Sequence, residues 1–189
     1  MKKKIKKQLP KEKKELGSWN PIKINQLNIH IMEVLNKKSA VLFQKIYSML
    51  DKDGYLKLDR DGEQAKQKAA KNNNADIDKY RCGIMALFVK KVDVVKVGSI
   101  EYERISFAHY YECKGNLIAD PEMMFLYNPS KADFIVPCYF LQPALSIEQN
   151  SIVFDENGVF KGYYPKMQAD HTEFINSVWF DNIKWQQNL

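Results

Sequence analysis

The sequence predicts an α+β domain, with an antiparallel meander sheet of about five or six strands packed against two N-terminal helices and one C-terminal helix. Three observations predict this class. Apolar residues recur at helical spacing towards both ends of the chain, side chains alternate with period two between about residues 84 and 164, and the links between alternating segments are short. Short links favour antiparallel pairing, because parallel strands need a crossover of about a dozen residues or more.

The helices are predicted from apolar stripes and capping signals. Two helices are expected before the sheet, over residues 21–38 and 40–53; Ser39 is the predicted N-cap of the second and Gly54 ends it. The C-terminal helix is expected to begin near Asp170, which forms an approximate capping box with Glu173. Its predicted buried stripe comprises Ile175, Val178, Trp179 and Ile183.

The strands are predicted from period-two alternation bounded by turn residues. They are expected in chain order at residues 55–58, 84–92, 99–114, 117–127, 134–142, 151–154 and 159–164. Residues 61–80 are almost devoid of large apolar side chains. We therefore predict a polar insertion at residues 61–80, with a helix over residues 63–71.

Charge is distributed unevenly along the chain. The net charge is +6, and residues 1–16 alone carry eight lysines and two glutamates. The first 91 residues sum to +12 and the remaining 98 sum to −6. Because like charges repel, we predict a disordered lysine-rich arm over residues 1–16, followed by a single α+β domain over residues 17–189. The alternative interpretation of the arm is a solubilising tail.

Lysines on the arm and on the insertion are candidate contacts to the phosphates of RNA or DNA. Lysine binds phosphates through charge and does not distinguish base sequence, so the expected binding is strongly dependent on salt. The predicted nucleic-acid-binding residues are Lys2, Lys3, Lys4, Lys6, Lys7, Lys11, Lys13, Lys14, Lys66, Lys68 and Lys71.

Several classes of protein are disfavoured by composition. No apolar run approaches the ~18 residues of a membrane span, so stable membrane insertion is not expected. The basic start has no hydrophobic segment after it, which predicts a cytoplasmic protein. Cys82, Cys113 and Cys138 are widely separated, so neither disulfides nor a zinc site is predicted, and we expect no metal and no cofactor. The sequence carries no signal of oligomeric state.

Residues 109–125, HYYECKGNLIADPEMMF, concentrate a histidine and three carboxylates. Which of these side chains lie opposite each other depends on the register of the predicted β-hairpin. With a three-residue connection, 114–116, Ile105 lies opposite Phe125. Asp120 and Glu122 then point away from the apolar face. With a two-residue turn at 115–116, His109 lies opposite Glu122. We favour the first, because burying an unpaired carboxylate costs several kcal/mol. His109 is then a core histidine.

The second register supplies an alternative function. A hydrolase using His109 with Glu122 and Asp120 would need that histidine beside a carboxylate. His109 and Cys113 do not form a metal site by themselves, because on a strand they lie about 13 Å apart. We therefore predict no enzyme activity and keep these three residues as the fallback catalytic group.

Three segments carry a resemblance to a known family. GYLKLD (54–59), MALFVKKV (85–92) and AHYYECKGNLIADPEMMF (108–125) resemble small domains of unknown function carried by bacteriophages and conjugative elements, with the pattern H-Y-x-x-x-G-[DN]-L-x-x-D-P-E-M. Lys90 stands where the pattern favours an acidic residue. The matching residues are His109, Tyr110, Gly115, Asn116, Leu117, Asp120, Pro121, Glu122 and Met123.

The resemblance implies a mobile-element setting, in which accessory proteins bind host or element machinery. We therefore expect a non-enzymatic phage or mobile-element protein that binds nucleic acid or a nucleoprotein effector of the host. Its most concrete form is an anti-CRISPR-like inhibitor of a nucleic-acid-guided defence system in a bacterial cell. The alternatives are the small hydrolase and a pure protein–protein interaction module whose acidic half docks on a basic partner.

Overall fold

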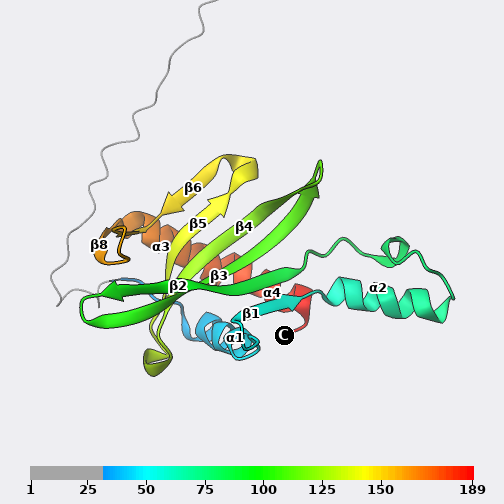
Figure 1. Ribbon diagram of the computed structural model, residues 1–189, viewed down its shortest axis with the longest axis horizontal. Helices are drawn as coiled ribbons and strands as arrows, with labels where there is room; N and C mark the ends of the chain where they lie inside the picture. The colour runs from blue at the N-terminus through cyan, green and yellow to red at the C-terminus, as the bar shows by residue number, and fades with distance from the viewer. Residues whose placement is uncertain (1–31) are drawn as a thin grey trace, which may run out of the picture.

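The computed structural model describes residues 32–189 and is built around a six-stranded antiparallel sheet. The strands follow one another in chain order across the sheet, which confirms the predicted meander (Figure 1). They are β1 (Tyr55–Leu58), β2 (Leu87–Val97), β3 (Ile100–Cys113), β4 (Asn116–Tyr127), β5 (Ile135–Gln142) and β6 (Ile147–Asn150). Short 3₁₀ turns, η3 (Pro129–Lys131) and η4 (Pro143–Leu145), join the last three.

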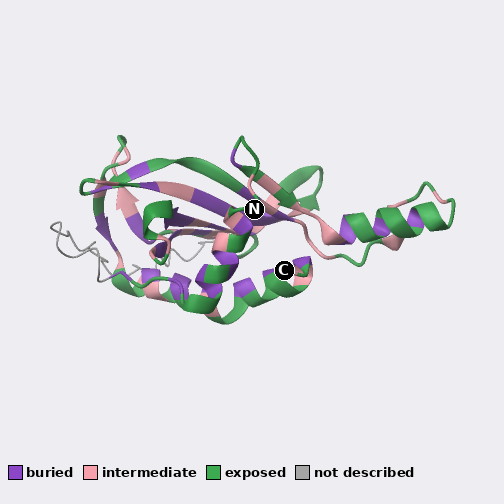
Figure 2. Ribbon diagram, turned by 90° about the horizontal axis from the view of Figure 1, so that it is seen from below, coloured by how far each residue is buried: buried purple, intermediate pink, exposed green. Residues whose placement is uncertain are grey.

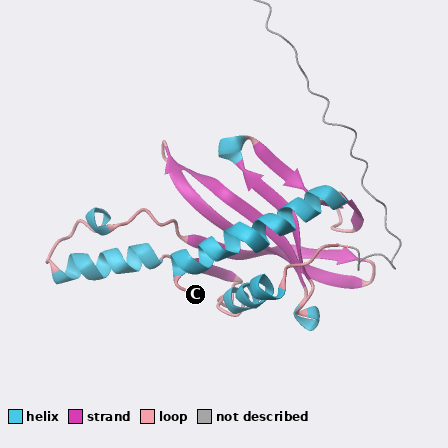
Figure 3. Cartoon of the chain, turned by 180° about the vertical axis from the view of Figure 1, so that it is seen from behind, coloured by secondary structure: helices cyan, strands magenta, loops and turns pink. Residues whose placement is uncertain are grey.

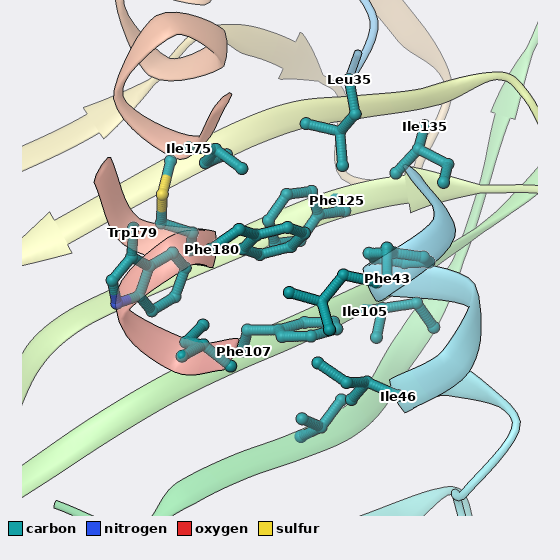
Figure 4. Close-up of a cluster of buried hydrophobic side chains, with 14 of the residues drawn as sticks. Leu35, Phe43, Ile46, Ile105, Phe107, Phe125, Ile135, Ile175, Trp179 and Phe180 are labelled. Atoms are coloured by element: carbon teal, nitrogen blue, oxygen red, sulfur yellow. The ribbon is translucent and has the colours of Figure 1, made fainter. Parts of the chain in front are cut away.

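Helices cover one face of this sheet (Figure 3). They are α1 (Lys37–Tyr47) and a continuous C-terminal helix made of α3 (Pro165–Phe174), the π-helical turn η5 (Ile175–Trp179) and α4 (Phe180–Gln187). The core between sheet and helices is aromatic (Figure 4). The ring of Phe43 on α1 lies 5.1 Å from that of Phe107 and 5.3 Å from that of Phe125, while Phe180 on α4 lies 5.8 Å from both. The two helices therefore share the same pair of sheet residues.

A second, two-stranded sheet packs against the main one and consists of β7 (Ile152–Phe154) and β8 (Phe160–Tyr163). Side chains from both strands join a second apolar cluster with residues from the sheet face opposite the helices, among them Val95, Tyr102, Leu126 and Val136. The last two predicted strands thus pair with each other. The edge of the main sheet is formed by β6, which the sequence analysis did not predict.

The N-terminal helices differ from the prediction. Most of the first predicted helix, 21–38, lies outside the described residues, and residues 33–36 are not helical. The backbone N–H of Leu35 instead donates to the carbonyl of Ile135, 3.0 Å away, which holds the segment against β5. The N-cap of α1 is Asn36, whose side chain accepts the N–H of Ser39, so the predicted cap Ser39 lies inside the helix.

The C-terminal helix begins five residues earlier than predicted. Pro165 occupies its first turn, where the missing N–H of proline is harmless, so Asp170 and Glu173 lie within the helix and do not cap it. Three members of the predicted stripe are buried, but Val178 is 45% exposed. The π-helical turn explains this, because its i→i+5 bonding shifts the phase of the following side chains.

The predicted polar insertion contains α2 (Arg60–Lys71) and the 3₁₀ turn η2 (Asp78–Tyr80). Figures 1 and 2 show α2 projecting from the sheet and the other helices, and its exposed faces are visible in Figure 2. Asp61 is 2% exposed and accepts the N–H groups of Cys82 and Gly83, so one buried carboxylate binds the returning chain to the helix. The helix predicted at residues 63–71 is the C-terminal part of α2, which begins at Arg60.

Candidate nucleic-acid interface

The β3–β4 hairpin combines two registers. Ile105 faces Phe125 in the favoured register, but the pairing shifts beyond Ala108 and ends with Cys113 opposite Asn116. The loop is thus Lys114–Gly115, with φ of 52° and 79°, and neither predicted turn is present. The favoured register holds from Glu103 to Ala108, and a bulge then shifts the pairing by one residue, so β3 and β4 do not form the register that would set His109 opposite Glu122. At this bulge the cis-linked Asp120 and Pro121 lie opposite His109.

The three fallback catalytic residues bond to different partners. His109 is 2% exposed on the helix side, where its Nδ1–H donates to the carbonyl of Ala86 at 3.0 Å. Glu122 lies on the other side of the sheet and accepts the hydroxyl of Ser106 at 2.6 Å. Asp120 accepts the side-chain amide of Gln142 at 2.8 Å. The hairpin thus does not form a histidine–carboxylate hydrogen bond.

The environment of His109 is that of a core histidine. Its ring centroid lies 5.9 Å from that of Trp179, in an edge-to-face arrangement. Burial lowers the pKa of His109, and this effect outweighs the carbonyl of Ala86 and the charge of Asp120, which raise it. Within residues 32–189, no group of three or more His, Cys, Asp or Glu side chains is placed to hold a metal ion.

The predicted lysines fall into two groups. Lys2, Lys3, Lys4, Lys6, Lys7, Lys11, Lys13 and Lys14 lie outside the described residues. Lys66, Lys68 and Lys71 are exposed on α2. Lys66 binds Glu63 at 2.8 Å, one turn away. The structure therefore places the described candidates along the projecting helix, with one of their three charges paired.

A groove that was not predicted from the sequence lies between α1 and α4. It has a volume of about 570 Å³, an apolar floor and a lysine rim. Among the described residues that line it, Asp181 has the only side-chain carboxylate, and Lys38 Nζ binds its Oδ2 at 2.7 Å. The floor comprises Val41, Leu42, Phe180 and Leu189, and the rim comprises Lys37, Lys38, Lys45 and Lys184.

The groove continues along α4 towards α2. A neighbouring hollow shares Asp181, Lys184 and Leu189 with it and adds Arg60 and Trp185. Trp185 is 71% exposed, the most exposed of the large apolar side chains described. The Arg60 guanidinium donates to the backbone carbonyl of Trp185 at 3.1 Å. Because Arg60 is the first residue of α2, the lysine-bearing helix begins where the groove ends.

Three rim lysines keep their charge uncompensated. Within residues 32–189, no carboxylate lies within ion-pair distance of Lys37, Lys45 or Lys184, although other lysines of the domain are paired. Lys91, Lys96 and Lys161 each lie within 3.3 Å of a carboxylate oxygen. The α1–α4 groove is therefore a local concentration of positive charge over an apolar surface, a combination suited to an anionic ligand with apolar parts.

The chain belongs to a family described as a domain of unknown function, DUF6908, which matches residues 30–189. Neither a curated protein nor a solved structure matches the chain. Among the helices of residues 32–189, none has the length and apolar character needed to cross a bilayer.

Proposed function

We propose that this DUF6908 protein is a non-enzymatic accessory protein of a phage or mobile element, and that it binds nucleic acid or a nucleoprotein complex through the α1–α4 groove. Its most concrete role is inhibition of a nucleic-acid-guided defence system in the cytoplasm of a bacterial host. The observation that carries the proposal is a set of lysines lining the groove, Lys37, Lys45 and Lys184, none of which has a carboxylate within ion-pair distance among residues 32–189. The mobile-element setting is supported by the sequence resemblance alone.

The charge balance of the groove favours a polyanion. Asp181, the carboxylate of the groove, is already neutralised by Lys38, so an approaching phosphate chain meets three free ammonium groups and little repulsion. Each lysine that neutralises a phosphate also releases condensed counterions, which favours binding at low salt. The lysines of α2 and of residues 1–16 extend the same charge and would add contacts that are independent of base sequence.

The hydrolase alternative receives no support from the arrangement of its residues. A general base needs a partner within hydrogen-bond reach, and His109 bonds to the carbonyl of Ala86. The binding proposal is therefore preferred to the hydrolase.

The test is the salt dependence of nucleic-acid binding in two charge-matched triple variants. The groove variant carries Lys37→Gln, Lys45→Gln and Lys184→Gln. The control carries Lys96→Gln, Lys114→Asn and Lys161→Gln, where asparagine suits the left-handed backbone at position 114. Each loses three positive charges.

Binding to labelled RNA and DNA is measured by fluorescence anisotropy over a range of salt concentrations. We expect the groove variant to reduce the slope of log K against log salt by about 2 to 3, whereas the control changes it by less than about 1. Deleting residues 1–16 should flatten the slope further. Equal slopes in the two triple variants, or no binding by the unmodified protein, would refute the proposal.

A further inference from the structure

The proposed charge contacts do not explain why a tryptophan, Trp185, is exposed at the end of the groove. Trp185 exposes 71% of its surface, and Val41, which lines the groove, exposes 57%. Lysines alone suffice to bind the outside of a duplex, which needs no apolar surface. An exposed tryptophan between cationic side chains is the arrangement that binds unpaired bases, because bases stack on aromatic rings while lysines follow the phosphates.

We propose that the α1–α4 groove binds single-stranded nucleic acid, with an unpaired base stacked on Trp185. This inference rests on the proposed function and narrows it to one class of ligand. Lys184 precedes Trp185 on α4 and lies on the rim of both hollows, so a strand in the groove meets a cation and an aromatic ring in succession. Arg60 also lines the second hollow and supplies a further positive charge there.

The local structure favours stacking because Trp185 is held by its backbone and not by its ring. The Arg60 guanidinium binds the carbonyl of Trp185, and the backbone N–H of Arg60 donates to the side-chain oxygen of Gln187 at 3.3 Å. These bonds hold the last turn of α4 against the start of α2. The indole remains exposed, so it contributes little to the folded core and its replacement leaves the fold intact.

The experiment compares a single strand of about 16 nucleotides with the duplex of the same sequence, using the full chain. RNA and DNA single strands are tested separately. An acidic amphipathic peptide is the third ligand and tests for a protein partner. The variants are Trp185→Ala and Trp185→Phe. Val178→Ala is the matched control, because Val178 is 45% exposed on the same continuous helix but does not line the groove.

We expect Trp185→Ala to weaken single-strand binding about tenfold and duplex binding less than about twofold, since stacking on one base is lost. Trp185→Phe retains most of the affinity, and Val178→Ala retains all of it. Tryptophan emission of the unmodified protein falls when a single strand binds, and in Trp185→Phe that fall is lost although binding persists. Tighter binding by RNA or by DNA then identifies which strand the groove prefers.

The results that overturn the inference are distinct from those that refute nucleic-acid binding itself. If Trp185→Ala leaves the affinity for the single strand unchanged, or weakens binding of the single strand and of the duplex equally, no base stacks on Trp185. The proposed contacts between lysines and phosphates are then not refuted. If the acidic peptide binds more tightly than any strand and Trp185→Ala abolishes its binding, the groove belongs to a protein partner. If neither strand nor duplex binds the unmodified protein, both proposals fail.

Discussion

Replacing His171 with glutamine removes a buried imidazole from α3 and with it a source of acid sensitivity. His171 is 4% exposed, its Nε2 lies 3.0 Å from the side-chain oxygen of Gln149, and its Nδ1 has no hydrogen-bond partner among the described residues. Burial lowers its pKa from 6.5 to about 4, although the charge of Asp170 opposes the shift. Protonation therefore favours the unfolded chain.

The magnitude follows from proton linkage. A histidine whose pKa is lower in the folded state contributes stability that is complete above the unfolded pKa of 6.5 and is lost as pH falls towards about 4. Each tenfold change in proton affinity is worth about 1.4 kcal/mol, so the full loss is about 3 kcal/mol, and about 2 kcal/mol is lost between pH 7 and pH 5. His171→Gln keeps an amide donor for Gln149 and does not titrate.

The assay is urea unfolding followed by circular dichroism at several pH values. The free energy of unfolding of the unmodified protein, minus that of His171→Gln, should fall by about 2 kcal/mol from pH 7 to pH 5. Other titrating groups, including His109, are present in both proteins and cancel. A difference that stays constant within about 0.5 kcal/mol over this range would show that His171 is not desolvated as described.

Three further predictions concern the core, a helix cap and a thiol. Phe43→Ala should lower the free energy of unfolding by about 3–5 kcal/mol in urea, because the fully buried ring contacts four other aromatic rings; a loss below about 1 kcal/mol would contradict this packing. Gly62→Ala should cost about 1 kcal/mol, since its Cβ would lie 2.5 Å from the carboxylate that caps α2, whereas Gln64→Ala on the exposed face should be neutral or stabilising. Burial raises the pKa of Cys138 to about 12, so native protein should react with a thiol reagent at two cysteines and at the third only after unfolding; labelling of Cys138 in folded protein would contradict its burial. The two reactive cysteines are Cys82 and Cys113.

The order of the strands was predictable because alternation and turn residues are local properties of the chain. The helix starts were less predictable. Asn36 and Ser39 are both suitable caps, and the choice between them depends on the contact of Leu35 with β5, which lies about a hundred residues away in sequence. The hairpin register was predicted for the half that is buried against the helices. The bulge opposite His109 escaped prediction, because both predicted registers ran uninterrupted along the whole hairpin.

The sequence by itself determined that positive charge gathers towards the amino end and that the sheet is a meander. It did not reveal the groove, because Lys184 and Trp185 are separated from Lys37 and Lys45 by about 140 positions. Only the tertiary structure placed Lys184 in one groove with Lys37 and Lys45, and Trp185 in the hollow next to it. The physical reason is apolar burial: Phe43 on α1 and Phe180 on α4 pack against the same two phenylalanines of the sheet, and this shared contact brings the cationic outer faces of the helices together.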